Sequence, residues 1–197
     1  AYDFAGRIVE YLYNQTDNFL QKNTIQYEYD INGNVTKKTV DNFMTEYIYD
    51  EDDDIVKVTL DDISLNYQRD YLGRLVSKNI NEHIPVEYTY YTNGNKTSFV
   101  LKSMKIEDEL YEYYYDDVYN LSKVFKNKNI LYEYYYDEFH ELIKEHNYET
   151  NRTYCYQYDV SGNILSKKEF EIHTSNLLHE DTYTYGNSNW EDQLTKF

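Results

Sequence analysis

The chain has 197 residues, a length that suits one domain of ordinary size. It contains 27 Tyr and 8 Phe but only 6 Gly, 1 Pro and 1 Cys, which excludes collagen-like sequences, Gly-rich linkers and a disulfide framework. With 36 Asp and Glu against 19 Lys and Arg, the net charge of −17 argues against nucleic acid as a partner. No apolar run is long enough to span a membrane.

One phrase recurs along the chain: Tyr, any residue, Tyr, Asp, two residues, Gly, then Asn or Arg, then an aliphatic residue. In chain order its copies are 27–35 (YEYDINGNV), 47–55 (YIYDEDDDI), 67–75 (YQRDYLGRL), 88–96 (YTYYTNGNK), 113–121 (YYYDDVYNL), 134–142 (YYYDEFHEL) and 156–164 (YQYDVSGNI). A partial copy opens the chain at 2–8 (YDFAGRI), and a degenerate one begins at Tyr183. This self-similarity predicts a single repeat array over residues 1–197 with about eight to nine units.

The repeat is defined by two tyrosines, an aspartate and a glycine, with substitutions in several copies. The residues that carry it are Tyr27, Tyr29, Asp30, Gly33, Tyr47, Tyr49, Asp50, Tyr67, Asp70, Gly73, Tyr88, Tyr90, Gly94, Tyr113, Tyr115, Asp116, Tyr134, Tyr136, Asp137, Tyr156, Tyr158, Asp159 and Gly162. Arg69 stands in the place of a second Tyr, and Tyr91 in the place of an Asp.

Each unit of about 20 residues has room for two strands and two short turns, so we interpret it as a β-hairpin. The two tyrosines of YxYD lie on one face of a strand, with the residue between them on the other. The Asp begins the turn and accepts backbone N–H groups, and Gly three residues later supplies the left-handed conformation of a type I turn with a bulge. Copies with Asp53, Tyr119 or His140 at the Gly position need another turn type or a strained left-handed residue.

This turn also predicts the register of the hairpin. The second Tyr faces the aliphatic residue, giving the pairs Tyr29–Val35, Tyr49–Ile55, Tyr115–Leu121 and Tyr158–Ile164. The first Tyr then faces the residue seven after Asp, which is often Lys: Lys37, Lys57, Lys123 and Lys144. The apolar residues of the second strand do not keep one parity, so either a bulge intervenes or both faces are partly covered.

Together these patterns predict an all-β fold of tandem antiparallel β-hairpins that forms a curved, twisted and open strip. The near absence of alanine, which occurs only at positions 1 and 5, disfavours a helical bundle. The edge strands of such a strip present unpaired N–H and C=O groups, which predicts self-association through the edges.

The YxYDxxGN/R phrase resembles the YD repeat of RHS-repeat proteins, and the segment 183–197, with Trp190, Asp192 and Leu194, resembles the last repeats before the RHS core. The resemblance implies a fragment of a larger chain and an open piece of an RHS-type shell. In that family the shell encloses a C-terminal effector in bacterial toxins, and a similar shell belongs to the animal teneurins. It also implies that the parent is a bacterial protein, secreted or at the cell surface, with the rest of its chain and an enclosed effector as partners.

Candidate sites are few. Asp50, Asp52 and Asp54 lie in an acidic run that could hold a hard cation such as calcium, or form a solvated hairpin tip. We interpret the recurrent turn aspartates as folding devices rather than catalytic carboxylates, and expect no enzyme activity and no cofactor. The tyrosine stripe either packs ring on ring or presents rings to a glycan. The predicted function is a scaffold or encapsulating shell, with a carbohydrate-binding or adhesion module as the alternative.

Overall fold

A computed structural model describes residues 1–13, 23–93, 96–187 and 190–196. The described residues form strands and turns, with no helix among them and hence no helix that could cross a membrane. Gly94 of the predicted repeat lies outside the described residues. The strands are β1 (Glu10–Tyr13), β2 (Asn23–Tyr29), β3 (Val35–Val40), β4 (Phe43–Tyr49), β5 (Ile55–Leu60), β6 (Ile63–Arg69), β7 (Leu75–Ile80), β8 (Ile84–Asn93), β9 (Lys96–Ile106), β10 (Glu109–Tyr115), β11 (Leu121–Lys126), β12 (Asn129–Tyr136), β13 (Leu142–Asn147), β14 (Arg152–Tyr158), β15 (Ile164–Glu171), β16 (Leu177–Thr182), β17 (Thr184–Asn187) and β18 (Trp190–Lys196).

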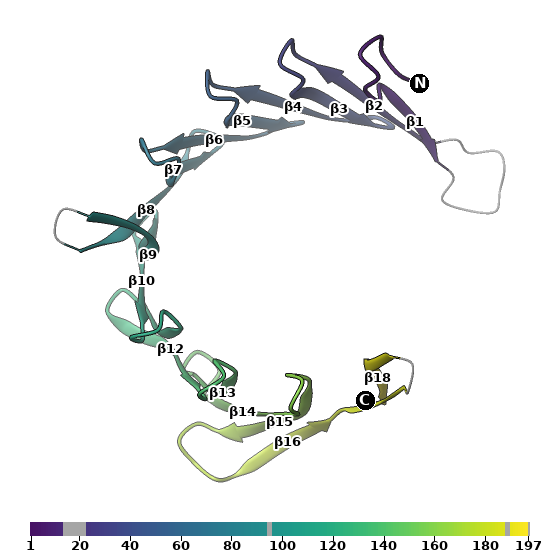
Figure 1. Cartoon of the computed structure of the whole chain (residues 1–197). Helices are drawn as coiled ribbons and strands as arrows, with labels where there is room; N and C mark the ends of the chain where they lie inside the picture. The colour runs from purple at the N-terminus through teal and green to yellow at the C-terminus, as the bar shows by residue number, and fades with distance from the viewer. Residues whose placement is uncertain (14–22, 94–95, 188–189, 197) are drawn as a thin grey trace. The chain divides into compact units, whose positions relative to one another are not determined.

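The chain divides into two compact units. The first comprises residues 1–89 and 105–107, and the second comprises residues 90–104 and 108–197. Within each unit the strands follow one another in chain order, and each pairs antiparallel with the next (Figure 1). In the second unit β17 and β18 form a separate hairpin. The predicted all-β class of tandem antiparallel hairpins is therefore confirmed.

The aspartate turns have the predicted geometry. Asp30 N–H donates to the Asn34 carbonyl at 3.0 Å, and Gly33 N–H donates to the Asp30 carbonyl at 3.3 Å. Gly33 has a φ of 98°, a left-handed conformation that costs glycine little. The predicted facing pairs are confirmed, and they are Tyr29–Val35, Tyr49–Ile55, Tyr115–Leu121 and Tyr158–Ile164.

The predicted lysine positions are wrong by one residue. Lys37 faces Glu28 rather than Tyr27, because Thr36 is an extra residue that shifts the register just after the facing pair. The same shift places Lys57 opposite Ile48, Lys123 opposite Tyr114 and Lys144 opposite Tyr135. A bulge therefore accounts for the mixed parity of the second strand, and it moves these lysines to the face opposite the tyrosine stripe.

Three copies without glycine keep the same turn and place a residue with a side chain in the left-handed region. The φ angles are 62° at Asp53, 69° at Tyr119 and 65° at His140. Of the two predicted alternatives, the strained left-handed residue is the one that occurs, at a cost of about 1–2 kcal/mol for each residue.

Few side chains of the described residues are fully buried. Val86 and Val124 are 3% and 7% exposed, and the polar residues His146, Thr153 and Ser166 are buried as well. The imidazole Nδ1 of His146 lies 2.8 Å from the Thr153 hydroxyl. Because so little apolar surface is enclosed, each unit depends on cross-strand side-chain pairs and hydrogen bonds rather than on a central core.

Glycine at the turn can be tested at Gly162, where φ is 84° and an added Cβ would lie 3.2 Å from a carboxylate oxygen of Glu141. We expect Gly162→Val to lower the free energy of unfolding by about 1–2 kcal/mol, because it forces a branched side chain into the left-handed region. The neighbouring Ser161→Val is the control, with an expected change below about 0.5 kcal/mol. Equal urea midpoints for the two variants would contradict the turn assignment.

Candidate functional site

In five repeats the second tyrosine connects its hairpin to the preceding one. In the first unit, the Tyr29 hydroxyl donates to the carbonyl of Ile8 at 2.7 Å, and the Tyr49 hydroxyl to that of Val35 at 2.8 Å. In the second unit the same bond joins Tyr136 to Leu121 (2.9 Å), Tyr158 to Leu142 (2.8 Å) and Tyr185 to Ile164 (3.1 Å). We call this series of bonds the hydroxyl ladder.

The acceptor of the hydroxyl ladder is the aliphatic residue that ends the repeat phrase. The backbone pairing between β3 and β4 runs from Val40 and Phe43 to Lys37 and Glu46, and stops there. The Val35 carbonyl lies beyond this last pair, and Tyr49 reaches it with its side chain. The phenol hydroxyl thus continues hydrogen bonding between hairpins where the backbone ladder has ended.

Arg69 shows that the ladder requires a donor of the right length rather than tyrosine itself. This residue replaces the second Tyr of its repeat, and its Nη1 donates to the Ile55 carbonyl at 2.7 Å. The backbone pairing of β5 with β6 stops at Lys57 and Asn66. The Arg69 bond lies just beyond this last pair, as the tyrosine bonds do at the other junctions. The substitution that weakens the sequence motif therefore preserves the contact.

The tyrosine rings pack along the stripe as well. Tyr27 stacks on Tyr29 with centroids 6.4 Å apart, and Tyr132 stacks on Tyr134 at 6.0 Å. Burial, followed by the charge of Glu145, raises the pKa of Tyr134 to about 12. At neutral pH this phenol is uncharged and keeps its hydrogen-bond donor.

Each turn aspartate holds its own turn closed. The Asp30 carboxylate accepts the Asn34 backbone N–H at 2.8 Å and the Asn34 side-chain amide at 3.1 Å. The Asp70 carboxylate accepts the Arg74 backbone N–H at 3.1 Å and the Arg74 Nε at 2.8 Å. The side-chain hydrogen bond from Arg74 is the main cause that lowers the pKa of Asp70. The carboxylates are thus occupied by local donors, as the sequence predicted.

Two left-handed residues also bind the turn before their own. Asp53 accepts the side-chain amide of Asn34 at 2.6 Å and that of Asn32 at 2.9 Å. His140 Nδ1 lies 3.0 Å from the side-chain amide of Asn120. These bonds offset part of the cost of a side chain in the left-handed region.

The predicted acidic run lines a surface hollow of about 430 Å³ together with Arg69 and Asp70. Asp50 uses one carboxylate oxygen to accept the backbone N–H groups of Asp52 and Asp54, at 3.0 and 2.9 Å. Asp54 lies 3.9 Å from Arg69 Nε. In the described part of the chain, no group of three or more His, Cys, Asp or Glu side chains is arranged to hold a metal ion.

A second set of turns, at the other end of the hairpins, has caps that the repeat phrase does not contain. The side-chain oxygen of Asp41 accepts the Thr24 backbone N–H at 2.8 Å, and Asn127 does the same for Leu110 at 2.8 Å. Asn81 accepts the Ser64 backbone N–H at 2.7 Å. An Asp or Asn just after the second strand of a unit is the sequence signal for this cap.

No protein-family model and no curated protein sequence matches the chain. Several solved structures, however, are similar to the chain. A crystal structure of TcdB2–TccC3–Cdc42 is similar with a TM-score of 0.68 and 17% identity, covering 95% of this chain and 12% of that one. TcdB2–TccC3 without its hypervariable C-terminal region gives 0.68 and 18%, with the same coverage. A Tc holotoxin pore from Photorhabdus luminescens gives 0.65 and 15%, covering 91% and 11%.

This chain spans about an eighth of the length of the structures it matches. The similar Tc toxin chains contain RHS/YD shell repeats, and the shared feature is the antiparallel strip of hairpins. The resemblance to RHS/YD repeats that the sequence indicated is therefore confirmed at the level of the fold.

The hydroxyl ladder can be tested with Tyr49→Phe, which removes the donor to Val35 and leaves the ring in place. We expect the free energy of unfolding to fall by about 1 kcal/mol, because a carbonyl loses its partner. Tyr71→Phe is the matched control, since Tyr71 is 85% exposed. If urea unfolding gives both variants the same stability as the parent, the ladder does not stabilise the fold.

The turn carboxylates predict a pH dependence of stability. Hydrogen bonds from the side chain and backbone of Asn163 lower the pKa of Asp159 below 3.8. Because the folded-state pKa lies below the unfolded one, the stabilisation is present above about pH 4 and is lost as the pH falls through the folded pKa. Asp159→Asn should flatten the decline in unfolding free energy between pH 5 and 3, measured by urea titration at each pH. Asp108→Asn, at an exposed position, should leave the decline unchanged.

Proposed function

We propose that this chain is a structural RHS/YD-repeat segment that contributes to the wall of a shell in a larger, secreted bacterial protein, and that the shell encloses a C-terminal effector. The hydroxyl ladder is the observation that carries the proposal, because it recurs from hairpin to hairpin in both units. A contact that each repeat makes only with its neighbour suits a wall built by repetition.

The similar structures support the proposed context. They belong to TcdB2–TccC3 chains, and one is described as lacking a hypervariable C-terminal region. A variable region that follows a shell of constant fold is what a container with exchangeable contents requires. We extend this arrangement to the parent of the present chain as part of the proposal.

The proposed role is not enzymatic. The recurrent carboxylates that could act as catalysts accept hydrogen bonds from their own turns, as at Asp30, Asp70 and Asp159. A glycosidase would instead need one pair of carboxylates across a cleft, at about 5–10 Å, that differs from its equivalents in other repeats. We infer that the aspartates serve the fold.

A carbohydrate-binding or adhesion module remains the second candidate function. It is favoured by rings on the face opposite the half-buried stripe, where Tyr114 and Tyr135 are 43% and 39% exposed and Lys144 covers one face of Tyr135. Exposed aromatic faces stack on sugar rings. Glycan-array binding that is lost in Tyr114→Ala and Tyr135→Ala would support this candidate over the shell.

The shell can be tested by limited proteolysis of the full-length protein, followed by mass spectrometry of the region after this segment. We expect that region to be protected in the parent protein. The double variant Tyr49→Phe, Tyr158→Phe should increase its cleavage, because two ladder bonds of the wall are removed. Tyr71→Phe should leave the cleavage rate unchanged. Rapid cleavage of the region in the parent protein would overturn the proposal of enclosure.

A further inference from the structure

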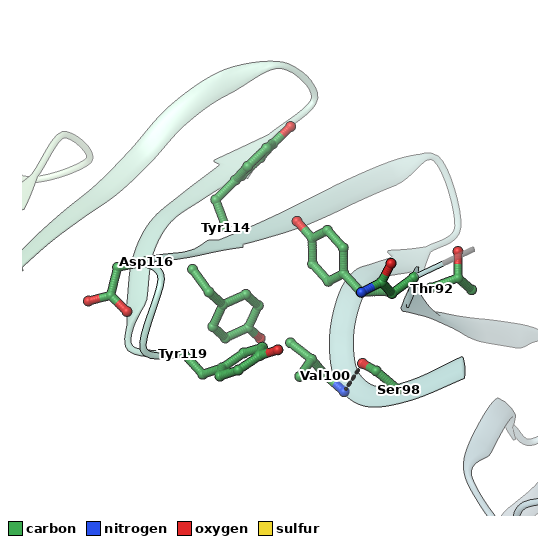
Figure 2. A pocket seen from close by; sticks show the side chains of 9 residues that line it. Thr92, Ser98, Val100, Tyr114, Asp116 and Tyr119 are labelled. Carbon is green, nitrogen blue, oxygen red and sulfur yellow. Dashed lines mark hydrogen bonds between the residues drawn. The ribbon is translucent and has the colours of Figure 1, made fainter. Parts of the chain in front are cut away.

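The repeat is interrupted in residues 90–104 of the second unit, where Tyr91 takes the place of the turn aspartate. Without that turn, β8 and β9 continue to 10 and 11 residues, whereas the strands on either side have six or seven. The extended hairpin and the next aspartate turn border an open hollow of about 290 Å³ (Figure 2). It is lined by Tyr91, Thr92, Asn93, Ser98, Val100, Tyr114, Tyr115, Asp116 and Tyr119. We call it the tyrosine pocket.

Aromatic rings form the walls of the tyrosine pocket. The rings of Tyr91 and Tyr115 are nearly perpendicular, at 82°, with centroids 6.1 Å apart. Two perpendicular rings make a corner, so that a group placed in the corner can meet a ring face. Tyr119 lies beside Val100 in Figure 2 and adds a further ring.

Tyr119 occupies the third position after the turn aspartate, where the repeat phrase has glycine. Its φ is 69°, an outlier for a bulky residue, and its side chain is 73% exposed. Asp53 and His140 hold the equivalent position and bind an asparagine of the preceding repeat. Burial of the ring therefore does not explain why a tyrosine holds this strained position. Backbone strain of this kind is found at ligand sites.

The charge of the tyrosine pocket is negative. Asp116 accepts the backbone N–H groups of Val118 and Asn120 and the Asn120 side-chain amide, at 2.8 to 3.0 Å. None of the nine described residues that line the pocket is Lys or Arg.

Elsewhere the molecule places its own cations over tyrosine rings. Lys144 Nζ lies 4.2 Å from the centroid of Tyr135, and Lys167 Nζ lies 4.8 Å from that of Tyr154. The Arg7 guanidinium lies 4.5 Å from the centroid of Tyr29. The tyrosine pocket also gathers tyrosine rings, but its lining supplies no cationic side chain.

We propose that the tyrosine pocket binds a small organic cation that carries an alkylated ammonium group. Ring faces attract such cations, and quaternary ammonium groups are the ligands that aromatic cages recognise. The volume of about 290 Å³ lies at the small end of the range for ligand sites, which suits a head group rather than an extended chain. The net charge of −17 favours a cation over an anion.

The test uses tetramethylammonium and choline as probes, followed by saturation-transfer NMR and by titration of the ring signals. The uncharged isostere of choline, in which carbon replaces the ammonium nitrogen, is the matched ligand control. We expect both cations to bind and the isostere to bind about tenfold more weakly, a difference of about 1.4 kcal/mol. Equal binding of the isostere, binding of glucose in place of the cations, or no binding of either cation would overturn the proposal.

Three variants test where the cation binds. Tyr119→Gly introduces the glycine of the repeat phrase and relieves the left-handed strain, so the protein should fold at least as stably while cation binding falls about tenfold. Tyr119→Phe keeps the ring and should keep the binding. Tyr71→Ala removes another exposed tyrosine outside the pocket and should have no effect. Unchanged binding in a folded Tyr119→Gly variant would overturn the assignment.

Discussion

A hydrogen bond from a phenol hydroxyl to a main-chain carbonyl is the interaction on which successive hairpins depend. Within a hairpin, backbone pairing and a closed turn are enough. Between hairpins, the backbone ladder ends before the aspartate turns are reached, as it does at Lys37 and Glu46. In five repeats the hydroxyl of the next repeat bridges that gap, and in each of these bonds the acceptor is the aliphatic residue that closes the preceding repeat phrase. The spacing from tyrosine to aliphatic residue is therefore set by two contacts, one within a hairpin and one between hairpins.

The bulge and the turn explain why this arrangement repeats. The extra residue after each aliphatic position, such as Thr36, shifts the register and so separates the tyrosine face from the lysine face. The carboxylate at the turn fixes the loop that brings the aliphatic residue back opposite the tyrosine. Because the units bury few side chains completely, stability is distributed over many local contacts rather than concentrated in a core.

Much of the fold could be predicted from the sequence, because alternation and turn chemistry are local signals. The strand character of YxYD, the glycine turn at Gly33 and the facing pair Tyr29–Val35 all follow from such signals. The position of Lys37 was predicted wrongly, since a bulge displaces every later pair by one, and the mixed parity of the second strand did not distinguish a bulge from a strand covered on both faces. The hydroxyl ladder could not be predicted, because it joins residues of different repeats and depends on where the backbone pairing stops. Arg69, which looks like a loss of the motif, makes the same contact.

That substitution has a consequence for how such a chain diverges. At each junction the structure requires only a donor that reaches one carbonyl, an acceptor that closes one turn, and a backbone that tolerates one left-handed residue. Arginine, and side chains as different as aspartate, tyrosine and histidine, each satisfy one of these requirements here. These few requirements are compatible with the 15–18% identity at which this chain and the similar solved structures share a fold.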